Sequence, residues 1–188
     1  ELIEVCEGQV LVMTFNERKN VTIDDYIEMI DKKTARLIET SAIIGAHIGE
    51  ASSEEIEAIR NISRNIGLAF QIQDDLLDMT STESNFGKPI GNDIIEGKKT
   101  FLVINAQKKV DDKNDKLLIE KFINQNGLSK DEVPIIDELF KRNNIYLDAQ
   151  EEIDLYFEKA LINLEFIKKN DYTDMLLQLI QSLNKRLI

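Results

Sequence analysis

Hydrophobic residues recur every three or four positions along most of the chain, which is the spacing of one helix face. The first such run ends near residues 16–20. The second begins at Thr22, which can cap a helix, and continues to about His47. The third begins at Ser52, which has capping-box spacing to Glu55, and continues to about Leu77. The expected apolar face of the first run is formed by Leu2, Val5, Cys6, Gln9, Val10 and Met13.

A different composition follows the third run. The stretch "TSTESNFGKPIGNDIIEGKK", residues 80–99, holds three of the eight glycines and one of the two prolines, which indicates a loop. Helical spacing resumes at about 99–109, 112–125, 130–143, 145–169 and 172–187. We therefore predict an all-α fold. With 188 residues and 43% hydrophobic content, we expect residues 1–188 to belong to one domain.

The charge and cysteine content narrow the possible partners. A formal net charge of −12 argues against nucleic acid, because phosphate binding needs a basic surface. The single cysteine, Cys6, cannot form an internal disulfide, which is typical of a reducing compartment. No apolar run reaches the roughly 18 residues needed to span a bilayer. We expect a cytoplasmic protein without a transmembrane segment.

An acidic strip lies in the third run, within "FQIQDDLLD" at residues 70–78. Residues four apart lie one above the other on a helix, so Asp74 and Asp78 repel each other there. Such acids commonly form a solvated face. Here they alternate with apolar residues that require packing, and buried carboxylates need a counter-charge. Clustered carboxylates with phosphate oxygens suit Mg²⁺.

Positively charged residues can complete such a site. Candidates near the acids in sequence are Lys33, Lys88, Lys98 and Lys99. Acids and ammonium groups together predict a site for a metal-bridged phosphate group.

Four ordered motifs give the chain a resemblance to the trans-isoprenyl diphosphate synthases, in particular the short-chain farnesyl and geranylgeranyl type. The motifs are "GQ" at Gly8 and Gln9, "KT" at Lys33 and Thr34, "FQIQDDLLD" at 70–78, and "GKPIGNDIIEGKKT" at 87–100. The resemblance implies a helical isoprenoid synthase fold with a central active-site cavity, of which this chain is expected to be the C-terminal part. It also implies a homodimer.

The resemblance also implies an activity. The enzymes condense an allylic diphosphate with isopentenyl diphosphate, and Mg²⁺ and lysines stabilise the departing pyrophosphate. "DDLLD" matches the second aspartate-rich motif, so Asp74 would bind Mg²⁺ directly, and Asp75 and Asp78 would hold metal-bound water. The residues expected to contact the allylic diphosphate and to act in catalysis are Lys33, Thr34, Gln71, Lys88 and Lys98.

Departures from the family pattern leave alternatives open. The first aspartate-rich motif is absent, so this chain alone is expected to be inactive. The family often has "GQxxD", whereas Val12 stands at the fifth position here. A noncatalytic partner subunit of a prenyl synthase is therefore the alternative function. A terpene cyclase ranks behind both, because its second metal motif usually differs.

Overall fold

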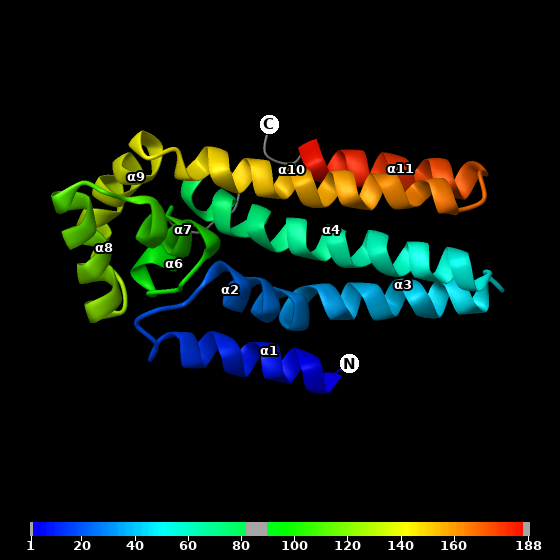
Figure 1. Cartoon of the computed structure of the whole chain (residues 1–188), viewed down its shortest axis with the longest axis horizontal. Helices are drawn as coiled ribbons and strands as arrows, with labels where there is room; N and C mark the ends of the chain where they lie inside the picture. Colours follow the sequence, from blue (N-terminus) through cyan, green and yellow to red (C-terminus); the bar gives the residue numbers. More distant parts are fainter. Residues whose placement is uncertain (1, 82–89, 186–188) are drawn as a thin grey trace. The chain divides into compact units, whose positions relative to one another are not determined.

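The computed structural model describes residues 2–81 and 90–185, and within these ranges it contains helices and loops but no strand. The predicted all-α fold is confirmed. In chain order the elements are α1 (Leu2–Phe15), α2 (Ile23–Ile30), the π-helical segment η1 (Asp31–Ala35), α3 (Arg36–Ile48), α4 (Ser53–Thr80), α6 (Asn92–Ile95), α7 (Phe101–Lys109), α8 (Lys113–Gln125), the 3-10 segment η2 (Lys130–Glu132), α9 (Val133–Arg142), α10 (Ile145–Asn163), the 3-10 segment η3 (Leu164–Phe166) and α11 (Asp171–Asn184) (Figure 1).

The chain divides into two compact units. The first comprises Glu1–Gln9, Ile27–Gln71 and Glu151–Ile188, and the second comprises Val10–Tyr26 and Ile72–Gln150. Helices α1, α2, α4 and α10 each contribute residues to both units.

In the first unit, α3 runs beside the N-terminal part of α4 (Figure 1). Ile62, Ile66 and Ala69 recur at helical spacing on α4 and are buried there, together with Ile30 and Ala35 from α2 and η1. The predicted apolar face of the third run is therefore a core face.

In the second unit, α8, α9 and the start of α10 bury Phe122, Phe140 and Ile145 completely. Tyr26 and Phe101 add an edge-to-face ring pair with centroids 6.1 Å apart. This ring pair fixes the end of the loop that follows α4 to the start of α2.

Both predicted helix starts carry the expected caps. Thr22 Oγ1 accepts a hydrogen bond from the Asp25 backbone N–H at 3.1 Å, and Asp25 Oδ2 accepts one from the Thr22 N–H at 2.9 Å. Ser52 and Glu55 form the same reciprocal pair ahead of α4. These caps are local interactions, which is why the sequence revealed them.

The structure differs from the predicted elements in three places. The second run is not one α-helix, because η1 separates α2 from α3. The short helix α6 lies inside the predicted loop. The predicted apolar residues of α1 do share a face, but Leu2, Cys6, Val10 and Met13 are exposed, whereas Gly8 is buried.

Among the residues described, no helix combines the length and the apolar character that crossing a membrane requires.

Two glycines allow neighbouring helices to approach η1 closely. A Cβ added to Gly8 of α1 would lie 2.5 Å from the backbone nitrogen of Lys33. A Cβ added to Gly67 of α4 would lie 2.6 Å from the Cα of Ala35. Each distance is too short for any side chain, so η1 packs backbone-to-backbone against both helices.

We expect Gly67→Ala to destabilise the protein, although alanine is intrinsically the better helix former by about 1 kcal/mol. The clash with the Ala35 backbone should outweigh that gain and lower the free energy of unfolding by about 1–3 kcal/mol. Gly45→Ala in α3 is the matched control, because an added Cβ there meets nothing within 4 Å. Urea denaturation should show a gain for the control, and an equal gain for Gly67→Ala would contradict the packing described.

Candidate functional site

Lys33 and Thr34 lie in η1, and their surroundings differ from those of the preceding lysine. Lys32 Nζ lies 3.2 Å from carboxylate oxygens of both Glu7 and Glu28. Lys33 is half-buried and has no carboxylate within ion-pair distance in residues 2–81 and 90–185. Its ammonium is therefore a cation that an anionic ligand can neutralise. π-helical segments inside longer helices occur frequently at functional sites.

Thr34 and Gln71 are brought together by the structure, although 37 residues separate them in sequence. Thr34 Oγ1 donates a hydrogen bond of 2.9 Å to Gln71 Oε1. This bond joins η1 to α4 and places the "KT" motif beside the "FQ" motif, as the predicted site requires.

Asp75 points into the core of the second unit and is only 6% exposed. Its Oδ2 accepts hydrogen bonds from the Tyr26 hydroxyl at 2.7 Å and the Phe101 backbone N–H at 3.2 Å. Burial, followed by the Asp75 charge, raises the pKa of Tyr26 well above its usual value, so the hydroxyl stays protonated as the donor. Asp75 thus holds α2, α4 and α7 together, and its role toward metal-bound water stays a prediction.

Asp74 and Asp78 lie one turn apart on α4, and Asp74 is exposed. Asp78 is half-buried and accepts a hydrogen bond from the Asp93 backbone N–H at 3.0 Å. Burial, followed by the negative charge of Asp93, raises the pKa of Asp78 to about 6. A bound divalent cation would reverse the effect of this crowding of negative charge.

Lys98 is linked to the surroundings of Asp78 through Asp93. Its Nζ lies 2.6 Å from Asp93 Oδ1 and 2.9 Å from Glu96 Oε2. Burial alone would lower the pKa of Lys98, but hydrogen bonds to Asp93 and Glu96 outweigh it and raise that pKa. The structure therefore groups Asp78, Asp93 and Lys98 in the second unit.

Lys99 does not fit the expectation that it faces the acidic strip. Its buried ammonium donates hydrogen bonds to the backbone carbonyl oxygens of Phe15 and Arg18. Phe15 is the last residue of α1, and its carbonyl oxygen also accepts a hydrogen bond from the Arg18 backbone N–H at 3.2 Å. Lys99 therefore binds the turn that ends α1. The expectation is wrong for Lys99 because its ammonium is used at a helix end. Lys88 lies outside the described residues.

The acidic groups of the described residues do not by themselves make a complete metal site. No group of three or more His, Cys, Asp or Glu side chains in residues 2–81 and 90–185 is arranged to hold a metal ion. Mg²⁺ commonly takes one or two protein carboxylates and fills its remaining positions with water and phosphate oxygens. Asp74 and Asp78 fit that pattern, since the first is exposed and the second lies in a crowded acidic environment.

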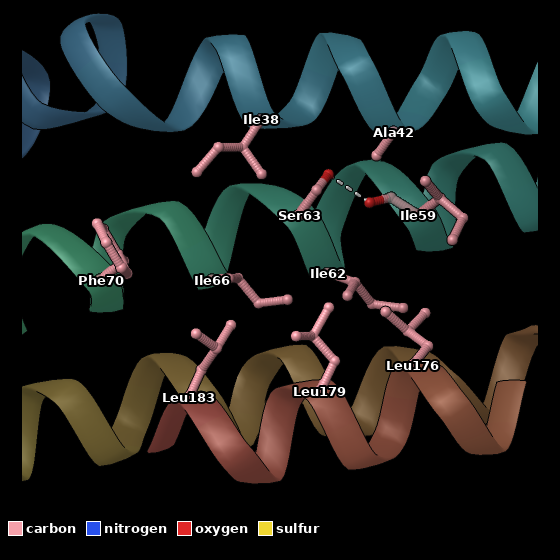
Figure 2. A pocket seen from close by; sticks show the side chains of 10 residues that line it. All are labelled: Ile38, Ala42, Ile59, Ile62, Ser63, Ile66, Phe70, Leu176, Leu179 and Leu183. Carbon is pink, nitrogen blue, oxygen red and sulfur yellow. Dashed lines mark hydrogen bonds between the residues drawn. The ribbon is translucent and has the colours of Figure 1, made fainter. Parts of the chain in front are cut away.

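An apolar pocket of about 360 Å³ lies in the first unit between α3, α4 and α11 (Figure 2). Its one polar lining residue, Ser63, donates its hydroxyl hydrogen bond to the backbone oxygen of Ile59 at 2.6 Å. The pocket therefore presents a hydrocarbon-like wall. It is lined by Ile38, Ala42, Ile59, Ile62, Ser63, Ile66, Phe70, Leu176, Leu179 and Leu183.

Sequence reasoning missed two residues that organise these groups. Tyr26 was not among the candidate residues, but its hydroxyl donates a hydrogen bond to Asp75. Asp93 lies within the fourth motif, "GKPIGNDIIEGKKT". The sequence could have indicated it, because this acidic residue precedes the two lysines of the same motif.

The chain matches the family model described as polyprenyl synthetase over residues 1–139. The short chain isoprenyl diphosphate synthase of Methanocaldococcus jannaschii is 47% identical over 124 residues, which are 66% of this chain and 38% of the relative. The geranylgeranyl pyrophosphate synthase of Geoglobus acetivorans is 35% identical over 184 residues, which are 98% of this chain and 55% of the relative.

A solved structure shows the same similarity. The geranylgeranyl pyrophosphate synthetase from Pyrococcus horikoshii superposes with a TM-score of 0.86 at 35% identity, covering 97% of this chain and 55% of that chain. The chain thus spans about half the length, or less, of the relatives it matches.

The raised pKa of Asp78 makes stability depend on pH. Its carboxyl titrates near pH 6 when folded and near 3.8 when unfolded, so the folded state binds the proton more tightly. The stabilisation from protonation is complete below about pH 3.8 and is lost as the pH rises through about 6.

We therefore expect Asp78→Asn, which cannot ionise, to stabilise the metal-free protein at pH 7.5. The gain should be about 1 kcal/mol, after a reduction for solvent screening at this half-exposed site, and it should vanish near pH 4. Denaturation curves at several pH values measure it. The exposed Asp24→Asn is the control, and a pH-independent effect at Asp78 would contradict the expectation.

Proposed function

Because the chain belongs to the polyprenyl synthetase family, we propose that it supplies diphosphate- and metal-binding residues of a prenyltransferase. The reaction is the condensation of an allylic diphosphate with isopentenyl diphosphate to give a longer isoprenyl diphosphate. Relatives named as isoprenyl and geranylgeranyl diphosphate synthases support this reaction class. The observation that carries the proposal is the position of Lys33, which has no carboxylate partner within the described part of the chain, beside the hydrogen-bonded Thr34 and Gln71.

In this proposal, Lys33 binds an oxygen of the allylic diphosphate, and Thr34 and Gln71 orient the same group. The bond between the allylic carbon and the diphosphate oxygen breaks, and its electron pair leaves with pyrophosphate. The Lys33 ammonium stabilises the negative charge that develops on the leaving group. The alkene of isopentenyl diphosphate then attacks the allylic cation and forms the new carbon–carbon bond. The cation that results loses a proton from the adjacent carbon to the released pyrophosphate, which gives the double bond of the longer isoprenyl diphosphate.

Asp74 is the proposed direct ligand of Mg²⁺, and Asp75 and Asp78 are proposed to hold metal-bound water. When bound, Mg²⁺ neutralises part of the phosphate charge. Lys98, held by Asp93, is proposed to contact the diphosphate from the loop after α4. Lys88 is proposed to do the same.

The apolar pocket supports the same substrate class. An allylic diphosphate carries a hydrocarbon chain, and the pocket lining is apolar apart from the satisfied Ser63. Phe70, at one end of the lining, directly precedes Gln71 on α4 (Figure 2).

A noncatalytic partner subunit is the second candidate. Val12 favours it, because the family often has an aspartate at that position of the "GQ" motif. A homodimer in the cytoplasm belongs to the first proposal and a complex with a complete synthase to the second. Sedimentation of the purified chain, together with a turnover assay using both diphosphates, separates the two.

We expect Lys33→Gln to lower the affinity for pyrophosphate in the presence of Mg²⁺ by about tenfold, the loss of one charged hydrogen bond. Lys32→Gln is the matched control, because its charge is already neutralised by Glu7 and Glu28. Titration calorimetry on both variants makes the comparison. Equal losses would show that pyrophosphate responds only to the overall charge.

We expect Asp74→Asn to abolish the dependence of pyrophosphate affinity on Mg²⁺, because the amide is a much weaker ligand than the carboxylate for a hard cation. Asp24→Asn, an exposed aspartate of α2, should leave that dependence unchanged. Calorimetric titrations with and without Mg²⁺ give the measurement. A retained Mg²⁺ effect in Asp74→Asn would remove this residue from the site.

A further inference from the structure

One face of α4 makes three successive contacts with η1. Its residues Arg64, Gly67 and Gln71 are three and four positions apart, so they share that face. Gly67 lies against Ala35, and Gln71 accepts the hydrogen bond of Thr34.

The third contact is a two-pronged ion pair between Arg64 and Asp31. Arg64 Nε donates to Asp31 Oδ1 at 2.7 Å, and its second guanidinium nitrogen donates to Oδ2 at 3.0 Å. Arg36 Nε also lies 3.2 Å from Asp31 Oδ2. Asp31 as a residue is only 7% exposed, and both of its carboxylate oxygens are paired inside the first unit.

Such a pair has a geometric consequence for a π-helical segment. The wider turn shifts the side chains that follow it out of the α-helical periodicity, so the register of η1 along α4 needs an added constraint. A bidentate arginine supplies one, because both nitrogens must face both carboxylate oxygens at once. Asp31 lies three residues before Thr34, and Arg64 lies seven before Gln71.

We infer that Asp31 and Arg64 are positioning residues, which fix the register of η1 so that Lys33 and Thr34 present their polar groups to the diphosphate. This inference rests on the proposed function. The pair itself does not touch the ligand. It acts through the backbone of η1, which Gly8 and Gly67 hold from two helices.

A second ion pair offers a matched control. Glu39 is only 3% exposed, and its Oε1 accepts a hydrogen bond from Arg60 at 2.6 Å. This pair also joins the run containing η1 to α4, but it lies on α3, beyond the π-helical segment. Glu39 is itself linked to Asp31 through Arg36, whose guanidinium donates to Glu39 Oε2 at 3.4 Å and lies 3.2 Å from Asp31 Oδ2. Arg60, whose guanidinium pairs with Glu39 and Glu57, is therefore the control position, and Arg60→Lys matches Arg64→Lys.

The experiment compares Asp31→Asn, Arg64→Lys and the control Arg60→Lys in the full chain. Unfolding free energy, backbone amide exchange over residues 31–36, and pyrophosphate affinity with Mg²⁺ are measured for each. We expect Asp31→Asn and Arg64→Lys to speed exchange in that segment and to weaken pyrophosphate binding, each about tenfold. Arg64→Lys keeps the positive charge but loses the guanidinium that binds both carboxylate oxygens of Asp31. Its effect therefore reports the geometry of the ion pair and not its charge. Arg60→Lys should lower stability and leave both other readouts within about twofold of wild type.

The outcomes separate this inference from the function on which it rests. Equal loss of affinity in Arg64→Lys and Arg60→Lys would overturn it, because general destabilisation would then explain the data. Unchanged amide exchange and unchanged pyrophosphate affinity in Asp31→Asn and Arg64→Lys would also overturn the positioning role. In that case, pyrophosphate binding by the wild type would still support the proposed function. If the wild type failed to bind pyrophosphate, the proposed function and the positioning role toward diphosphate would both fall, and exchange would still decide whether the pair sets the register of η1.

Discussion

The close approach of backbones at η1 is the constraint on which the first unit depends. Gly8 and Gly67 each leave no room for a side chain, so two helices meet the π-helical segment directly. That contact holds the widened helical turn close to both helices, and the pair of Asp31 and Arg64 is inferred to fix its register along α4. The positions of Lys33 and Thr34 follow from it, and so does the hydrogen bond from Thr34 to Gln71. A packing requirement thus determines where the polar chemistry of this unit can occur.

Helix α4 shows how two consecutive aspartates acquire different roles. Neighbouring residues on a helix are rotated by about 100°, so Asp74 and Asp75 cannot face the same surroundings. Asp75 is enclosed by Tyr26 and Phe101, whereas Asp74 is exposed. Asp78 lies between these extremes, and its raised pKa records the burial and the nearby acids. One short motif therefore combines a core hydrogen-bond acceptor with groups able to meet a cation.

Two pairs of adjacent lysines also acquire different roles. Lys32 is neutralised by two glutamates, and its neighbour Lys33 has no carboxylate partner in the part of the chain described. Lys98 binds Asp93 beside Asp78, and its neighbour Lys99 is buried at the end of α1. In each pair the two residues are of the same type, and only their surroundings differ. One ammonium group makes a structural contact, and the other lies beside candidate site residues.

Local information in the sequence was enough to predict the all-α fold, the helix runs and the caps at Thr22 and Ser52. Those features depend on interactions within about four residues, and spacing and residue type report them directly. The motifs also identified Lys33, Thr34, Gln71 and the acids of α4 as candidate residues. Spacing and residue type did not predict three features: the π-helical segment, the burial of Asp75 and the exposed face of α1. Tertiary structure alone decided these, together with the hydrogen bonds of Lys99 and the pairing of Asp31 with Arg64, because each depends on which distant backbone or side chain packs against the residue.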